Sequence, residues 1–342
     1  MSLSGVRSLG RWETVLLVVL VALGWLGTRL SPAFLSAQNF ANLTVAEMEV
    51  AIIAVPMTLI IIAGEIDLSV ESLVGLSSAV LGFLWAAGAP LWAGIALVLI
   101  MGALGGLLNG VLVTRAGLPS LVVTLGSLAL FRGLASVVLG PRAISNFPPQ
   151  FTAFGFGTVP GAPVPWPLVV FGVLALVLGL LLHRTWLGRQ IFAVGKNERA
   201  ARYSGVAVVR LKTGLFMLSG VVSALAGVIL TSRLSSARAD AGLGMTLAVV
   251  TAVLLGGVNI FGGSGTIPGV ALAIFTLAVL QNALRLADVS TELQSITVGL
   301  LLIVSVVVPN AAGQITRFLR RGRAERHPSR GARERVPPYT PA

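Results

Sequence analysis

Long apolar runs separated by short polar segments follow one another from residue 13 to residue 309. A helix needs about 20 apolar residues to cross the hydrocarbon core of a bilayer, so each run is long enough for one span. The pattern predicts an all-α, polytopic membrane helical bundle of about ten transmembrane helices. The predicted spans are residues 13–30, 44–63, 72–88, 91–113, 120–139, 165–182, 213–232, 246–261, 266–284 and 293–309.

The basic residues predict the orientation of these spans. Cytoplasmic loops of membrane proteins carry an excess of lysine and arginine. If residues 1–12 are cytoplasmic, the segments on that side hold 18 of the 24 basic residues. We therefore expect both termini in the cytoplasm. These cytoplasmic segments are 1–12, 64–71, 114–119, 183–212, 262–265 and 310–342.

Three parts of the chain differ in composition. An apolar transmembrane domain covers residues 13–309, between a short N-terminus at 1–12 and a basic tail at 310–342. The tail is expected to be disordered and attracted to anionic lipid. Loop 183–212 is the only long cytoplasmic loop between predicted spans. The net charge of +12 flanks apolar runs, so membrane lipid and not nucleic acid is the expected partner.

The residue types present exclude several kinds of site. The chain has no cysteine and two histidines, both placed outside the predicted spans. No thiolate or histidine metal cluster is therefore expected within the membrane, and no cofactor. A membrane-embedded enzyme would also lack a plausible catalytic set, so we expect no catalytic residues.

Two triplets hint at an internal repeat. Three residue types recur with the same spacing: Asn109, Thr124 and Gly126 correspond to Asn282, Thr297 and Gly299. The match pairs the fourth and fifth predicted spans with the ninth and tenth. An offset of five spans makes the two copies antiparallel, and inverted repeats are a transporter architecture.

Residues 64–71 interrupt two apolar runs with three carboxylates. If the neighbouring helices are straight, these charges are solvated at the cytoplasmic interface and Asp67 caps the next helix. If a helix is broken here, the segment lines a transport path, because charges at membrane depth are costly and usually functional. Both interpretations stay open.

Glycines mark this break and a second one at residues 256–265, where positive φ angles permit a tight reversal. A phosphate-binding loop is the alternative for the second run, but the GxxxxGK[ST] spacing is absent. We expect a turn between two spans. The glycines assigned to the two breaks are Gly64, Gly257, Gly262, Gly263 and Gly265.

A short helix is expected inside loop 183–212. Asn197 is suited to cap it, Glu198 lies in its first turn and Gly205 ends it. The small side chains of Ala200 and Ala201 would let a partner approach closely. The alternative is a surface helix lying on lipid headgroups.

A few polar side chains fall inside the predicted spans. Arg132, Asn109, Thr124, Asn282 and Thr297 are candidates for a translocation path, together with Asp67. Hydrogen bonding between helices is the alternative role for each of them.

Several of these segments resemble one family. Residues 64–72 are similar to the Gly-Gly-Ile-Asp-Leu-Ser-Val-Gly-Ser signature of permease subunits of bacterial ABC sugar importers, of the ribose, rhamnose and autoinducer-2 type. Residues 119–126, 188–205 and 256–265 resemble further segments of that family in the same order. Residues 236–242 and 259–265 look most like its rhamnose and autoinducer-2 branch. Glu65 and Glu71 depart from the pattern, which commonly has glycine there.

The resemblance implies a function and a set of partners. It implies a non-catalytic permease in the cytoplasmic membrane of a bacterium, moving a small sugar such as rhamnose, autoinducer-2 or ribose. Its partners would be a cytoplasmic ABC ATPase that hydrolyses ATP, a second permease subunit of the same or a homologous kind, and an extracytoplasmic sugar-binding protein. Loop 183–212 would then contact the ATPase. The alternative function is an ion-gradient-driven secondary transporter of a small polar solute, with Asp67 or Glu65 carrying the charge.

Overall fold

The computed structural model of the chain describes residues 3–162, 164–305 and 307. The predicted tail at 310–342 lies outside the described residues. The numbered helices are α1 (Leu3–Leu30), α2 (Ala37–Ala46), α3 (Met48–Ile62), α4 (Val70–Ala86), α5 (Leu91–Thr114), α6 (Ser120–Leu139), α7 (Pro149–Phe156), α8 (Trp166–Arg184), α9 (Trp186–Lys196), α10 (Glu198–Tyr203), α11 (Val208–Leu234), α12 (Met245–Leu255) and α13 (Ile267–Leu286). A further apolar helix follows at Thr291–Ser305.

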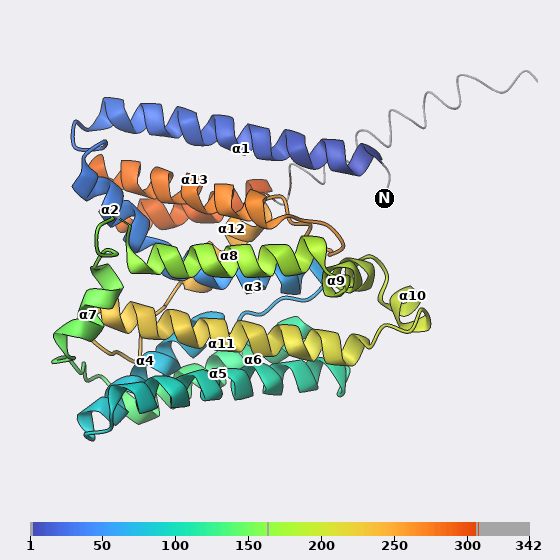
Figure 1. Cartoon of the computed structure of the whole chain (residues 1–342), viewed down its shortest axis with the longest axis horizontal. Coiled ribbons are helices and arrows are strands. Elements are labelled where there is room, and N and C mark those ends of the chain that lie inside the picture. Colours follow the sequence, from blue (N-terminus) through green and yellow to red (C-terminus); the bar gives the residue numbers. More distant parts are fainter. Residues whose placement is uncertain (1–2, 163, 306, 308–342) are drawn as a thin grey trace, which may run out of the picture.

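The helices form a bundle whose long members run roughly parallel to one another (Figure 1). Within the described residues, six helices are long and apolar enough to cross a membrane, or seven if the bent pair α2 and α3 is one span. The predicted all-α polytopic bundle is therefore confirmed. The predicted number of about ten spans is not, because three predicted spans correspond to apolar helices of only 10–17 residues, namely α4, α12 and Thr291–Ser305.

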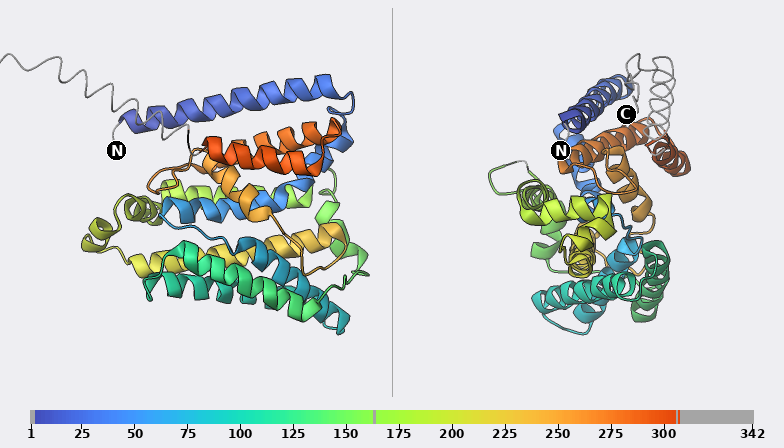
Figure 2. Two further views of the ribbon diagram at one scale, coloured as in Figure 1. Left: turned by 180° about the vertical axis from the view of Figure 1, so that it is seen from behind. Right: turned by 90° about the vertical axis from the view of Figure 1, so that its right-hand side faces the viewer.

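The core of the bundle surrounds α3. All fifteen residues of this helix are buried, and α8, α11, α12 and α13 pack against it. Apart from Glu49, α3 is largely apolar on every side, which suits a helix that neighbouring helices cover all round. By contrast, α1 lies along one edge of the bundle and packs mainly against α13, while α5 and α6 lie at the opposite edge (Figure 2).

Close packing of α5 on α11 depends on glycines four residues apart. A Cβ at Gly102 or Gly106 would overlap the backbone of α11 at Gly220 or Phe216. A Cβ at Gly110 would lie 2.8 Å from the Cα of Thr213. Small residues at this spacing let two membrane helices approach until their backbones touch.

Two short helices, α4 and α12, begin inside the bundle. Each follows a non-helical segment, residues 63–69 before α4 and residues 235–244 before α12. The two N-termini meet, since the Thr246 N–H donates to Glu71 Oε2 at 3.1 Å. From there α4 runs toward the end of the bundle that carries α7, and α12 runs toward the end that carries α9 and α10 (Figure 1). These are the third and eighth predicted spans, so an antiparallel repeat with an offset of five spans accounts for the arrangement.

The N-terminal end of α1 lies at the same end of the bundle as α9 and α10 (Figure 1). We call this the α10 end and the other, marked by α7, the α7 end. Loop 183–212 therefore projects from the side on which the described chain begins, as the distribution of basic residues requires.

Candidate translocation path and coupling site

Asp67 lies at the centre of a buried polar network in the first break. Its side chain is fully buried. Its Oδ1 accepts hydrogen bonds from the N–H and Oγ of Ser69, at 3.0 and 2.6 Å, and its Oδ2 accepts one from Ser219 Oγ at 2.9 Å. The segment thus runs as non-helical chain inside the bundle before α4 begins, and Asp67 is not solvated at an interface. Its bonds to Ser69, the residue preceding α4, nevertheless order the start of that helix.

Asn109 and Thr124 join the same network from α5 and α6. Asn109 Nδ2 donates to Ser69 Oγ at 2.9 Å, and its Oδ1 accepts from Ser127. Thr124 Oγ1 lies 3.4 Å from the carbonyl oxygen of Ile66. The structure therefore brings three of the candidate path residues to one place, where hydrogen bonds between helices occupy them.

Arg132 connects the starts of the two short helices. Its Nη1 donates to the carbonyl oxygens of Ala239 and Ala241, at 3.0 and 3.4 Å. Its Nη2 lies 3.7 Å from Glu71 Oε1, and Glu71 Oε2 accepts from the first turn of α12. A carboxylate at a helix N-terminus is favourable because the helix dipole is positive there. Glu71, a departure from the family pattern, is thus placed inside α4 and not in a turn.

A cavity of about 630 Å³ opens beside Arg132. It lies at the C-terminal end of α6, before α7, and so at the α7 end of the bundle. Three arginines and one aspartate give it a positive lining. The lining residues are Arg132, Ser136, Gly140, Pro141, Arg142, Ala143, Arg238, Ala239 and Asp240.

The structure places the other two path candidates elsewhere. Asn282 on α13 forms a reciprocal pair of amide hydrogen bonds with Asn39 on α2, at 2.9 and 3.0 Å. Thr297 donates to the Leu293 carbonyl of its own helix. Neither residue contacts the Asp67 network or lines the cavity.

The short helix expected in loop 183–212 is α10. Asn197 is its N-cap, with Oδ1 accepting from the Ala200 N–H at 3.0 Å. Ala200 and Gly205 are exposed, but Ala201 is only 5% exposed and packs into the core. Ala201 therefore does not lie on a surface that a partner could approach. Tyr203, at 93% exposure, does.

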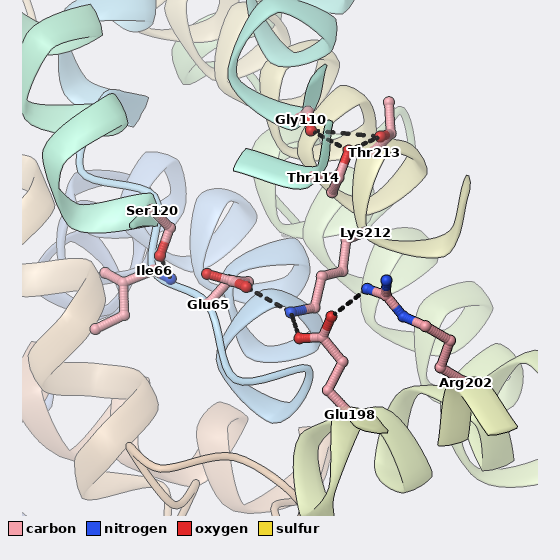
Figure 3. A network of polar contacts seen from close by, with 9 residues as sticks. All are labelled: Glu65, Ile66, Gly110, Thr114, Ser120, Glu198, Arg202, Lys212 and Thr213. Atoms are coloured by element: carbon pink, nitrogen blue, oxygen red, sulfur yellow. Dashed lines mark hydrogen bonds and ion pairs between the residues drawn. The ribbon is translucent and has the colours of Figure 1, made fainter. Parts of the chain in front are cut away.

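A buried lysine ties α10 to the first break (Figure 3). Lys212 Nζ lies 2.5 Å from Glu65 Oε1 and 2.7 Å from Glu198 Oε2. Arg202 adds a bond of 2.9 Å to the other oxygen of Glu198. The hydrogen bond from Lys212 holds the pKa of the Glu198 carboxyl below its usual value.

The five predicted break glycines all have positive φ angles. Two of them at the α10 end, Gly262 and Gly263, also let the turn before α13 approach the first break and α9 closely. The Gly263 N–H donates to the Ile62 carbonyl at the end of α3, at 2.8 Å. A Cβ at Gly262 would come within 3.1 Å of Gly64 and within 3.0 Å of the Gly195 carbonyl in α9. The glycine run therefore packs the turn before α13 against both the first break and α9.

Sequence reasoning missed the partners of two buried glutamates and two hydrogen-bond donors at the first break, Ser219 and Lys212. Glu49 is fully buried on α3, with Oε1 2.8 Å from Arg233 Nε. Glu47 lies 3.9 Å from Arg285. Both glutamates fall inside the predicted span 44–63, so their position was a visible signal. Ser219 and Lys212 carried no such signal, because only the fold brings them to the break.

The chain was compared with known proteins. Residues 39–306 match the family described as the permease component of the branched-chain amino acid transport system. The chain belongs to this permease family. A relative from Yersinia enterocolitica, the autoinducer 2 import system permease protein LsrD, is 43% identical over 264 residues, which are 75% of this chain and 79% of the relative. LsrD of Klebsiella pneumoniae is 39% identical over 302 residues, covering 86% and 90% of the two chains. No solved structure matches the chain significantly.

The matches confirm the resemblance read from the sequence motifs. The chain is a permease of the type found in bacterial ABC importers, and its relatives are transport permeases and not enzymes. Together with its apolar helices, this membership makes it a multi-pass membrane protein. The family description names branched-chain amino acids, whereas the two LsrD proteins are named for autoinducer 2.

Proposed function

We propose that the chain is the membrane permease subunit of an ATP-driven importer that carries autoinducer-2, or a similar small sugar such as rhamnose or ribose, across the bacterial cytoplasmic membrane. The names of its relatives support the substrate class. The observation that carries the proposal is the meeting of α4 and α12 inside the bundle. Broken helices that start at mid-membrane in opposite directions are typical of a transport path.

The path in this proposal begins at the cavity beside Arg132 and passes the starts of α4 and α12 toward the first break. Arginine and neutral amide or hydroxyl groups suit a ligand rich in hydroxyls. Asn109 and Thr124 would become available to a substrate when the first break moves. Asn282 and Thr297 lie away from this route, and a role for them in translocation stays a prediction.

The proposed orientation puts the α10 end in the cytoplasm, with both termini, and the cavity outside. Loop 183–212 then contacts the partner ATPase, and a sugar-binding protein delivers substrate at the α7 end. A second permease subunit, identical or homologous, completes the membrane part. ATP is hydrolysed in the partner, so this chain binds no cofactor and catalyses no reaction.

The rival function, transport driven by an ion gradient, needs a carboxylate that gains and loses an ion. Asp67 already accepts three hydrogen bonds, and Glu65 is paired with Lys212. Neither environment favours such a role over a structural one. Both carboxylates are held by groups that would have to move before an ion could bind.

Uptake by vesicles containing the reconstituted complex separates the two functions. ATP is supplied inside, the binding protein and labelled autoinducer-2 or rhamnose outside, and an ionophore collapses ion gradients. We expect uptake that needs ATP and ignores the ionophore. Uptake that follows the gradient without ATP would assign the chain to the secondary transporters.

The ATPase contact is tested on the exposed face of α10. Tyr203→Glu should reduce co-purification of the ATPase, while Tyr203→Phe should preserve it. Ala201→Glu is unsuitable because Ala201 is buried, and a side chain at Gly205 would be strained by its φ of +84°. Normal ATPase binding and uptake in Tyr203→Glu would leave α10 as a surface helix only.

A further inference from the structure

Lys212 sits between two elements that are separate in the sequence. Its side chain is 7% exposed, and its ammonium group is shared by Glu65 in the first break and Glu198 in α10 (Figure 3). Replacing a buried ion pair by apolar residues often stabilises a protein, so such a pair is weak evidence for stability. The geometry of these ion pairs suits instead a role in positioning the first break relative to α10.

The backbone next to Lys212 is held on α5. Thr213 Oγ1 lies 3.1 Å from Thr114 Oγ1 and 3.4 Å from the Gly110 carbonyl (Figure 3). The close packing of α5 on α11 at Gly110 holds this part of α11 in place. The backbone at Lys212 is therefore fixed, whereas its ammonium group lies at the end of a flexible side chain and binds two carboxylates that reach it from elements on either side.

The residues after Glu65 lead directly into the polar network. The Ile66 N–H donates to Ser120 Oγ at 3.3 Å, and Asp67 follows with its three hydrogen bonds. A displacement of Glu65 thus changes the contacts of the break with α6 and α11. On the other side, Glu198 is in the first turn of α10, whose Tyr203 is exposed.

We propose that Lys212 is a positioning residue that transmits movement of α10 to the first break, through Glu198 on one side and Glu65 on the other. The inference rests on the proposed function, because it requires α10 to contact the ATPase.

The test measures transported sugar per ATP hydrolysed in the reconstituted complex. Glu65→Gln and Glu198→Gln each keep the size of the side chain but remove its charge. We expect either change to lower the sugar-to-ATP ratio about five-fold while the ATPase still co-purifies. Lys212→Arg, which keeps the charge, should stay within about two-fold of the unchanged protein. Glu292→Gln, on an exposed residue outside the network, is the matched control.

A variant that fails to fold does not end the test. If Glu65→Gln leaves the buried Lys212 charge too poorly compensated, Glu65→Gln combined with Lys212→Met removes both charges and should fold yet remain uncoupled. If the folded variants transport as much sugar per ATP as Glu292→Gln, the ion pairs only support the fold and the proposal is wrong. Absence of ATP-dependent uptake by the unchanged complex would instead refute the proposed function.

Discussion

The first break and the non-helical segment before α12, residues 235–244 (the α12 break), produce the same geometry by different chemistry. In both, a non-helical segment leads to a helix that begins inside the bundle. Residues 63–69 are held mainly by side chains, because Asp67 and Asn109 bind Ser69 and its neighbours. Residues 235–244 are held mainly through backbone groups, since Arg132 binds two of their carbonyl oxygens.

Glycine is used differently in the two segments as well. The α12 break has positive φ angles at Gly242 and Gly244, directly before α12. Glycine adopts such angles without steric cost and changes them easily. The first break has its positive φ at Gly64, before the polar network begins. We therefore expect the α12 break to adjust its backbone, and the first break to move as a unit when Glu65 is displaced.

The largest expected effect comes from removing the acceptor at the centre of the first break. Asp67→Leu leaves three buried donors, the O–H groups of Ser69 and Ser219 and the Ser69 N–H, without their acceptor, so it should destabilise the protein by at least about 3 kcal/mol. Asp67→Asn keeps one oxygen for Ser69, and Ser219 can reverse its hydroxyl to accept from the amide. It should therefore cost much less. The measurement is thermal unfolding in detergent, together with the yield of monodisperse protein.

Asp240 in the α12 break provides the comparison for Asp67. Its side chain is 50% exposed and pairs with the exposed Arg238. Asp240→Leu should change the unfolding temperature little, because solvent replaces the lost partner. Equal losses for Asp67→Leu and Asp240→Leu would remove the distinction between a break held by side chains and one held by the backbone.

An intermediate effect is expected from alanine at the two glycines of the α12 break, Gly242 and Gly244. Gly244 has open space around its Cα, so Gly244→Ala should cost only the strain of a φ of +81°, about 1 kcal/mol. Gly242→Ala adds a contact of 2.8 Å with Val74 and should cost more. Unfolding temperatures of the two variants test this order. A larger loss for Gly244→Ala would mean that its surroundings, and not its backbone, set the cost.

Apolar run length and charge predicted the all-α bundle, the positions of most helices and the helix capped by Asn197. For the carboxylates of residues 64–71, the same reasoning left two alternatives open. They would be solvated if the adjoining helices were straight, or would line a transport path if a helix was broken. A pattern along the chain does not show that Ser219 or Lys212, about 150 residues away, supplies their partners. Nor does it distinguish Ala200 from Ala201, since that difference depends on which face of α10 the rest of the fold covers.

The smallest expected effect concerns pH, and it applies only to the first break, which is tied to α10 by a titratable group. The hydrogen bond from Lys212 lowers the pKa of Glu198 below 4.5 in the folded protein. This stabilisation is therefore fully present above pH 4.5 and is lost as the pH falls through the lower, folded-state pKa. Because the Glu198 side chain is 41% exposed, solvent screens the interaction and the loss should be about 0.5 kcal/mol.

Hydrogen exchange in residues 197–205, corrected for the intrinsic effect of pH, should show weaker protection below pH 4.5 in the unchanged protein. In Glu198→Gln it should be weaker at all pH values and free of this transition. The same transition in both proteins would mean that another group controls the attachment of α10.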